Sequence, residues 1–285
     1  MPVVTVSYSF SFNGLTFGGA STPYQILSVD GLEGIPQIRN QDDNRGYADG
    51  MFSGQDFLSG RTITITFLTL ATAGGNSAQT NLNTIQNALL PQTTGTTPLY
   101  FILPPSGEQF INARVRSFVT TVNPDYTYGF ITSQVTFFCP DASYFDSTLQ
   151  TGVLSVSNPL GRTYNRTYNL EYGGGSTAVT TPVTNSGRWT AYPTITLNGP
   201  ITNPILGNTT QGKYLSFTGT YTNTDSLVID LYNKLVTLNG VTARNLLTTG
   251  EWFSAPVGTS QFYMTGTGTL AGTTSATVTW RNTYI

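Results

Sequence analysis

The feature that most constrains this chain is a two-residue alternation of apolar and polar side chains. Residues 61–70 read Arg-Thr-Ile-Thr-Ile-Thr-Phe-Leu-Thr-Leu. Residues 4–12 follow the same rule, with apolar side chains at Val4, Val6, Tyr8, Phe10 and Phe12. Successive side chains of a strand point to opposite faces of a sheet, so this period is typical of half-buried β-strands. The chain is therefore expected to be mainly β.

Turn signals and one interruption agree with this interpretation. Asn13-Gly14 follows the first alternating segment, and both residues tolerate positive φ, which favours a tight hairpin turn. Two long strands are expected over 110–122 and 126–138. In the first of them the apolar positions change from odd to even numbers, which predicts a β-bulge near Ser117.

One amphipathic helix is expected in the N-terminal half. Leu82, Ile85 and Leu89 recur at spacings of three and four, which places them on one helix face. A side-chain oxygen of Asn76 or Ser77 can cap the first turn, and a proline just beyond Leu89 ends the helix. Because only one face is apolar, the helix is expected to lie on a sheet.

Residues 39–60 break the pattern. They are polar and contain several glycines, without a helical or strand period. Connectors longer than about 12–15 residues are usually functional or mobile. This segment is expected to be extended or poorly ordered in an isolated chain.

Composition excludes several kinds of function. The chain has no histidine and one cysteine, Cys139, so it cannot form a Ser-His-Asp triad, an imidazole metal site, an internal disulfide or a Cys-pair zinc site. Charged residues make up 9% of the chain and the net charge is −2, which argues against a nucleic-acid-binding surface. The 50 threonines supply surface polarity instead. No apolar run reaches the ~20 residues that span a bilayer, and no signal peptide is recognisable, so folding in a cytosol is expected.

A change in charge marks the expected domain boundary. Residues 1–150 carry 5 basic and 10 acidic residues, whereas residues 151–285 carry 7 basic and 4 acidic residues. From Tyr192 onward, short strands alternate with turns about every ten residues, which is typical of a β-sandwich. The sequence predicts domains at 1–150 and 151–285, with the compact core of the second at about 188–285.

Candidate chemistry is sparse. Carboxylate pairs occur at Asp42/Asp43, Asp225/Asp230 and Asp30/Glu33. Glycosidase chemistry needs two carboxyl groups across a cleft, and a calcium loop needs oxygen ligands at alternating positions. Neither arrangement is present locally, so these acids are expected to be turn formers or solvated charges. No catalytic, metal or cofactor residue is predicted.

The three tryptophans, Trp189, Trp252 and Trp280, are the candidates for stacking against a sugar ring. Trp280 is in phase with Val278 and Ala276, which favours a core position. Trp252 lies in an expected loop before Pro256, so it is the candidate sugar-binding residue. The alternative role for Trp252 is packing. Cys139 is expected to be a small buried hydrophobe.

The order of motifs in the C-terminal half carries more information than any one of them. These motifs are Tyr192–Pro200, Asn203-Pro204, Gly212–Phe217, Asp225–Asp230, Val236–Gly240, Trp252, Pro256–Gly258 and Val278–Arg281. The N-terminal half adds Phe12–Leu15, Gly31-Leu32, Arg39, Asp49-Gly50, Arg61–Ile65 and Cys139–Tyr144. The succession resembles the distal tail proteins of bacteriophages with long, non-contractile tails, over nearly the whole chain.

The resemblance implies a structural virion protein at the phage tail tip, assembled in the cytoplasm of the host bacterium. It implies a tail-tube-like N-terminal β-sandwich or split barrel with one helix, which forms a homo-hexameric ring, and a galectin-like C-terminal β-sandwich outside the ring. The implied partners are the tail tube protein, the tape measure protein and a tail-tip or baseplate hub protein. DNA would only pass through the channel, and neither a cofactor nor a membrane is implied. The 39–60 segment would then be an arm that reaches a neighbouring subunit.

Two other functions stay open from the residues alone. The C-terminal sandwich could be a carbohydrate-binding module for host adsorption, through Trp252. Carboxyl groups distant in sequence could also converge into a surface glycosidase site.

Overall fold

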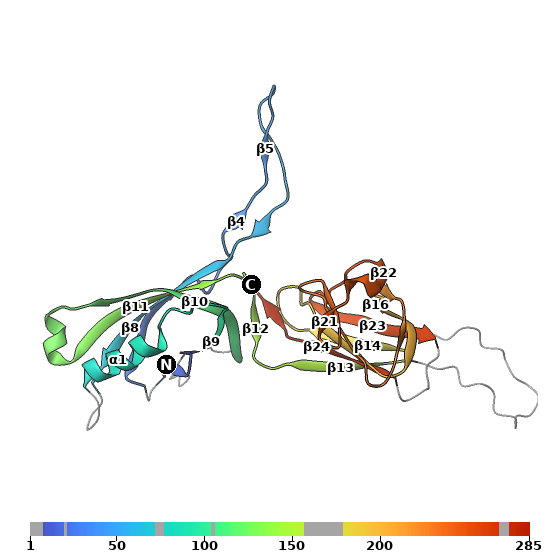
Figure 1. The fold of residues 1–285 in the computed structure, drawn as a ribbon. Coiled ribbons are helices and arrows are strands. Elements are labelled where there is room, and N and C mark those ends of the chain that lie inside the picture. Colours follow the sequence, from blue (N-terminus) through green and yellow to red (C-terminus); the bar gives the residue numbers. More distant parts are fainter. Residues whose placement is uncertain (1–7, 20–21, 72–76, 104–105, 157–178, 268–273) are drawn as a thin grey trace, which may run out of the picture. The chain divides into compact units, whose positions relative to one another are not determined.

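The computed structural model describes residues 8–19, 22–71, 77–103, 106–156, 179–267 and 274–285 (Figure 1). The chain divides into two compact units, an N-terminal unit of residues 1–147 with 284–285 and a C-terminal unit of residues 148–283. Each unit has its own hydrophobic core. The mainly β fold is confirmed, and α1 (Ala78–Ala88) is the single α-helix among the described residues. The expected strand residues 4–7 lie outside them.

One nine-stranded sheet forms the N-terminal unit. Its main path runs β2-β1-β9-β10-β11-β8-β3, and β12 pairs with β10 and β25. The strands are β1 (Ser9–Phe12), β2 (Leu15–Gly18), β3 (Tyr24–Asp30), β8 (Arg61–Leu70), β9 (Thr97–Ile102), β10 (Glu108–Thr121), β11 (Phe130–Cys139), β12 (Tyr144–Asp146) and β25 (Thr283–Tyr284). The path ends at β2 and β3, so these strands do not close into a barrel.

The core of this unit follows the alternation in the sequence. On β8, Ile63, Ile65 and Phe67 are fully buried, and the threonines between them face outward. Phenylalanine rings from different strands meet here; those of Phe17 and Phe67 lie 5.1 Å apart. Burying each such side chain stabilises the fold by about 1.5–3 kcal/mol. Tyr8 is exposed, because β1 begins only at Ser9.

The expected helix is confirmed as α1. The Ser77 hydroxyl accepts a hydrogen bond from the Thr80 backbone N–H at 3.2 Å and caps the first turn. Leu82 and Ile85 are buried against the sheet, and Leu89 is buried at the C-cap. The alternative cap, Asn76, lies outside the described residues.

Local turn chemistry is also confirmed. Asn13 and Gly14 adopt φ of 48° and 79° and join β1 to β2. The register of β10 against β11 shifts between Val115 and Ser117, as expected for the bulge. The second long strand begins at Phe130 rather than at residue 126, because residues 124–128 form a 3-10 helix, η1 (Pro124–Tyr128).

Arg61, the first residue of β8, is only 3% exposed. Its Nη1 donates to the carbonyl oxygens of Gly31, at 3.3 Å, and Leu32, and its Nε donates to the carbonyl of Ala142 at 3.3 Å. The guanidinium carbon lies 5.7 Å from the Tyr144 ring centre. Burial lowers the Arg61 pKa from its ordinary value, and the carbonyl dipoles offset part of the desolvation. The Arg61 side chain therefore links the start of β8 to the segments that follow β3 and β11.

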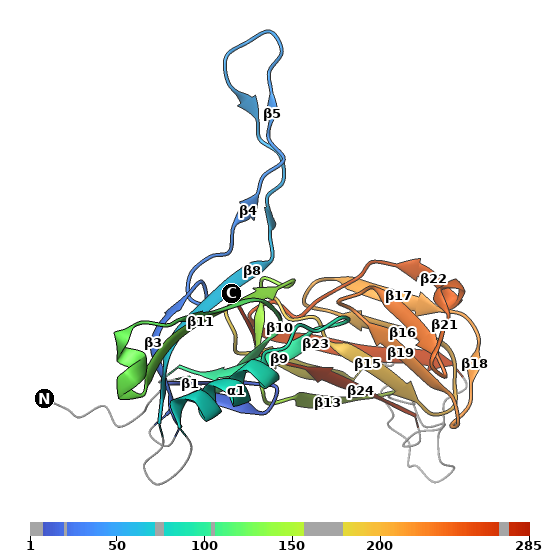
Figure 2. The ribbon, with the colours of Figure 1, turned by 60° about the vertical axis from the view of Figure 1, so that its left-hand side comes forward.

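The C-terminal unit is a sandwich of two antiparallel sheets around one core (Figure 2). One sheet runs β13-β24-β15-β19-β20-β21; the other runs β14-β23-β16-β17-β22, with β18 beside β16. The first contains β13 (Gln150–Ser155), β15 (Thr194–Asn198), β19 (Ser226–Asp230), β20 (Leu235–Leu238), β21 (Val241–Thr242) and β24 (Ser275–Trp280). The second contains β14 (Thr180–Asn185), β16 (Ile201–Asn208), β17 (Lys213–Phe217), β18 (Thr220–Tyr221), β22 (Leu247–Gly250) and β23 (Gly258–Thr267). A short 3-10 helix, η2 (Arg244–Leu246), precedes β22.

The sheets of the C-terminal unit extend beyond the expected core of 188–285. β13 pairs along β24 and β14 pairs along β23, so each adds a strand at a sheet edge. Buried Asn185 closes β14: its Nδ2 donates to the carbonyls of Trp189 and Ala255, and its Oδ1 accepts from the Gly187 N–H. A chain that begins at residue 188 lacks these partners.

Hydroxyl groups of neighbouring strands pair with each other at positions where many proteins have charged side chains. Thr184 contacts Thr259 at 3.0 Å, Thr202 contacts Thr220 at 3.1 Å, and Thr120 contacts Ser133 at 3.2 Å. Such cross-strand pairs stabilise a sheet by roughly 0.2–1 kcal/mol each. Threonine thus supplies surface polarity without charge.

The first prediction concerns Arg61. Arg61→Met should lower the free energy of unfolding of the N-terminal unit by about 3 kcal/mol, because three carbonyls lose a charged donor. Denaturant unfolding of the full chain measures this. The control is Arg116→Ala, an exposed arginine over the Phe138 ring, which should cost less than about 1 kcal/mol. Equal losses for the two variants would contradict the assigned role of Arg61.

The second prediction concerns the extent of the C-terminal unit. Residues 148–285 should be soluble and unfold cooperatively, whereas residues 188–285 should be aggregated or molten, because Leu154 and Val183 are removed from the core. Near-ultraviolet circular dichroism and thermal unfolding measure both. A cooperative 188–285 fragment would show that β13 and β14 are dispensable.

Candidate functional site

An arm leaves the N-terminal unit between β3 and β8 (Figures 1 and 2). It is a ribbon in which β4 (Ile38–Arg39) pairs with β7 (Phe57–Leu58), and β5 (Asp43–Asn44) pairs with β6 (Met51–Phe52). Every residue from 37 to 57 is exposed. The extended conformation expected for residues 39–60 is therefore present, with short strand pairs that the sequence did not indicate.

The arm is held by contacts between its two sides. The Ser59 N–H donates to the Gln37 carbonyl at 2.9 Å, and the Gly54 N–H donates to Asp42 Oδ1 at 2.9 Å. A Cβ on Gly54 would lie 2.0 Å from the Gln41 carbonyl oxygen, so only glycine allows this approach. Isolated two-stranded ribbons are marginally stable in water. The arm is therefore a weakly stabilised part of the fold.

Apolar side chains on the arm lack a core. The exposed ones are Ile38, Tyr47, Met51, Phe52 and Phe57. Two are partly covered by arginines of the arm itself: the guanidinium carbon of Arg39 lies 5.5 Å from the Phe57 ring centre, and that of Arg45 lies 5.1 Å from the Phe52 ring centre. Exposed apolar groups of this kind mark an interaction surface.

A second apolar surface lies at the far end of the β10–β11 hairpin. This tip surface consists of Val119, Val122, Tyr126, Tyr128 and Phe130, all exposed. Val122 and Tyr128 are 72% and 77% exposed, values well above those of ordinary half-buried sheet residues. The hydroxyl of Tyr126 donates to Gln79 Oε1 of α1 at 2.7 Å, which fixes the hairpin end on the helix.

The candidate carboxylates lie on the arm, at the ends of β3 and β19, and in the adjoining turns. Asp42 accepts from Gly54 and Asn40, and Asp43 accepts from the Asn44 N–H. Hydrogen bonds from Asn239 and Thr222 lower the pKa of Asp225, and Asp230 accepts from the backbone of Tyr232 and Asn233. Asp30 and Glu33 are exposed. Among the described residues, no three or more acidic or cysteine side chains gather as a metal site.

Trp252 is partly buried against the core of the C-terminal unit. The Arg244 guanidinium carbon lies 4.9 Å from its ring centre, so a cation already covers one ring face. Trp280 is buried, as expected, and its Nε1 donates to the Thr184 carbonyl at 2.8 Å. Cys139 is fully buried, which confirms its expected role, and burial raises its pKa to about 12.

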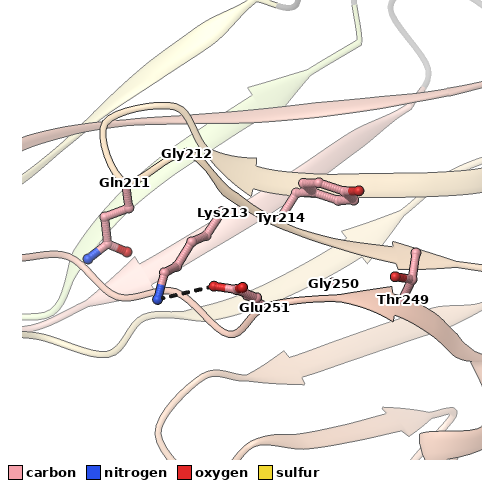
Figure 3. Close-up of a pocket in the computed structure, with 7 residues that line it drawn as sticks. All are labelled: Gln211, Gly212, Lys213, Tyr214, Thr249, Gly250 and Glu251. Carbon is pink, nitrogen blue, oxygen red and sulfur yellow. Dashed lines mark ion pairs between the residues drawn. The ribbon is translucent and has the colours of Figure 1, made fainter.

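A shallow pocket lies between the start of β17 and the end of β22 (Figure 3). Lys213 and Glu251 form an ion pair across it, with Nζ and Oε2 3.5 Å apart. Tyr214 and Thr249 line another part of the pocket. Sequence reasoning missed this pocket, because its residues meet only through the β17–β22 register.

No described helix is both long enough and apolar enough to cross a bilayer.

Comparison with known proteins agrees with this architecture. Residues 186–284 match the family model of the siphovirus-type tail component, C-terminal domain. Most of the C-terminal unit is thus similar to the C-terminal domain of siphovirus-type tail components. Over its whole length the chain shares the fold of the distal tail (Dit) protein of SPP1: the two structures are similar with a TM-score of 0.66 and 14% identity over 98% of this chain and 99% of that chain. That protein is described as a paradigm of the hub adsorption apparatus in phages that infect Gram-positive bacteria.

Two structures of the phage P2 baseplate in its activated conformation were also found. The one with Ca has a TM-score of 0.49 and 10% identity, and the one with Sr has a TM-score of 0.45 and 9% identity. Each alignment covers 96% of this chain and 97% of the matched baseplate chain. A search of curated protein sequences gave no match.

Proposed function

We propose that this protein is the distal tail hub of a phage virion, a structural protein rather than an enzyme. Six copies form a homo-hexameric ring through their N-terminal units. The ring joins the tail tube and tape measure proteins to tail-tip or baseplate proteins, and it leaves a channel for DNA. The C-terminal units carry the tail-tip partner. Assembly takes place in the bacterial host cytoplasm.

The observation that carries this proposal is the arm. Its exposed apolar side chains have no core of their own, so a protein surface is needed to cover them. Burying apolar area would stabilise that contact by about 25 cal/mol per Å². Interface centres are also depleted in charge and enriched in aromatic residues and arginine. The arm offers Phe52 and Phe57, each with its arginine.

A closed ring needs two different complementary surfaces on every copy, because each contact in it is head-to-tail. The arm is one such surface, and the tip surface is the second. Both belong to the N-terminal unit and both are apolar at their centres. In the proposed ring, the arm of one copy covers the tip surface of the next.

The net charge of the N-terminal half is compatible with a channel for DNA. Residues 1–150 carry net charge −5, so six copies contribute about −30. Four of the ten acids, Asp42, Asp43, Asp49 and Asp56, are on the exposed arm. An acid-rich channel wall repels phosphate, whereas a basic wall would hold DNA by counterion release.

The third prediction is that the arm is required for the ring. Gln37 and Ser59 are already hydrogen-bonded to each other, so residues 38–58 can be replaced by Asn-Gly without moving either end. The full chain should scatter light as a species of about 180 kDa, six times the 30.7 kDa chain, and the deletion variant as a monomer.

Asp49→Asn is the control for the arm deletion, because it changes an exposed arm residue without removing apolar area. It should still form the ring, and electron microscopy of that ring should show a central opening. A deletion variant that remains hexameric would exclude the arm as the ring contact.

The fourth prediction concerns the tip surface. Val122→Glu should abolish the ring, because an unpaired carboxylate would be buried at the contact. Val241→Glu is the matched control: Val241 is 71% exposed, close to the 72% of Val122, but lies in the C-terminal unit. Sedimentation velocity distinguishes the two. If both variants formed hexamers, a different surface would have to receive the arm.

A further inference from the structure

We propose that one end of the C-terminal sandwich binds an acidic segment of a partner protein. The binding surface consists of side chains on the segments that connect the strands, and we call it the loop-end surface. Its members are Tyr192, Tyr232, Lys234, Arg244 and Trp252. The inference rests on the proposed attachment of a tail-tip partner to the C-terminal unit, and it names where that partner binds and what chemistry it offers.

Direct contacts join the five side chains into one surface. Tyr192 precedes β15 and Tyr232 follows β19; these strands pair, and the two ring centres lie 5.6 Å apart. Lys234 belongs to the same turn as Tyr232, and its carbonyl oxygen accepts a hydrogen bond from Arg244 Nη1 at 3.0 Å. The guanidinium carbon of Arg244 lies 4.9 Å from the Trp252 ring centre. Four separate segments therefore contribute to a continuous patch.

The residue types of this patch are those of protein-recognition sites. Connecting loops at one end of a β-sandwich carry recognition in antibodies. Interface hot spots are enriched in Trp, Tyr and Arg, and aromatic side chains give a large contact area at a low cost in conformational entropy. Tyr192 and Tyr232 are 44% and 50% exposed, so both rings are accessible. The composition favours a protein partner.

The backbone beneath the patch is already fixed. Asp230 Oδ1 accepts hydrogen bonds from the N–H groups of Tyr232 and Asn233, at 2.9 and 3.1 Å, which sets the turn after β19. Ala191 and Ala255 exchange two backbone hydrogen bonds of 2.9 and 2.8 Å, which holds the segment before β15 against the segment after β22. A surface that is formed before the partner arrives loses less entropy on binding.

Charge decides the class of partner. Lys234 and Arg244 are exposed, and neither forms an ion pair with a residue that the structure describes. The nearby carboxylates are engaged: Asp230 accepts hydrogen bonds within its own turn, and Glu251 pairs with Lys213 at 3.5 Å. An acidic segment can form charge-assisted hydrogen bonds with both free cations, whereas a basic segment would be repelled. The patch therefore selects an anionic partner.

The test is selection of a random dodecapeptide library, made by mRNA display, on the full-length protein. The enriched peptides should carry net negative charge. Each is then synthesised with fluorescein, and its affinity is measured by fluorescence anisotropy. The double variant Lys234→Gln with Arg244→Gln should weaken binding about tenfold, because two charged donors are lost. Tyr232→Ala should weaken it by about the same factor, because a hot-spot ring is removed.

Arg116→Gln is the matched control. The guanidinium carbon of Arg116 lies 4.8 Å from the Phe138 ring centre, nearly the same geometry as at Trp252, but in the N-terminal unit. Binding of the enriched peptides should be unchanged in this variant. An equal loss in the control and in the double variant would show non-specific attraction to arginine and would overturn the proposal.

Other results would also overturn it. These are no enrichment, enrichment of neutral or basic peptides, undiminished binding by the double variant, or displacement of the peptide by oligothymidylate of the same length as strongly as by unlabelled peptide. Light scattering on the same samples reports the ring independently. A ring that binds no acidic peptide would reject only the loop-end surface, whereas peptide binding by a chain that forms no ring would reject only the hub function.

Discussion

The buried guanidinium of Arg61 is the joint on which the N-terminal unit depends. It donates to the main-chain carbonyls of Gly31 and Leu32, which precede the arm, and to that of Ala142, which follows β11. Main-chain carbonyls that leave a sheet inside a protein must find donors, and a guanidinium supplies several in a fixed plane. The arrangement also needs Gly31, where a Cβ would lie 2.0 Å from the Thr62 carbonyl oxygen. A long exposed ribbon can therefore start from a rigid base.

The arm has few internal contacts compared with the rest of the N-terminal unit. Its two sides meet through two short pairs of β-bridges and a few side-chain contacts, so most of its stabilisation must come from outside the ribbon. Low intrinsic stability combined with exposed aromatic rings suits a segment that becomes fixed on assembly. The C-terminal unit differs in this respect, because its two sheets bury their own apolar faces against each other.

Local rules predicted much of the fold. Positive φ at Asn13-Gly14, the spacing of Leu82 and Ile85, and the phase of Trp280 each depend on neighbours in sequence. Three features could not be predicted this way. β13 has one fully buried residue, Leu154, and its apolar neighbour Val153 is exposed, so its residue types show no apolar–polar alternation. The Arg244–Trp252 contact and the pairing of Gly207 with both Tyr214 and Tyr263 arise only from long-range packing and strand register.

The hydroxyl pairs between strands have a consequence for how the sheets respond to pH and dissolved salt. A threonine hydroxyl does not titrate, and a contact between two hydroxyls is not weakened by dissolved ions as an ion pair is. The chain also has no histidine, the side chain whose ordinary pKa falls between pH 5 and 8. These hydroxyl pairs are therefore expected to keep their hydrogen bonds over a wide range of pH and salt concentration. Their tolerance of such changes is built into the residue types and needs no regulatory response.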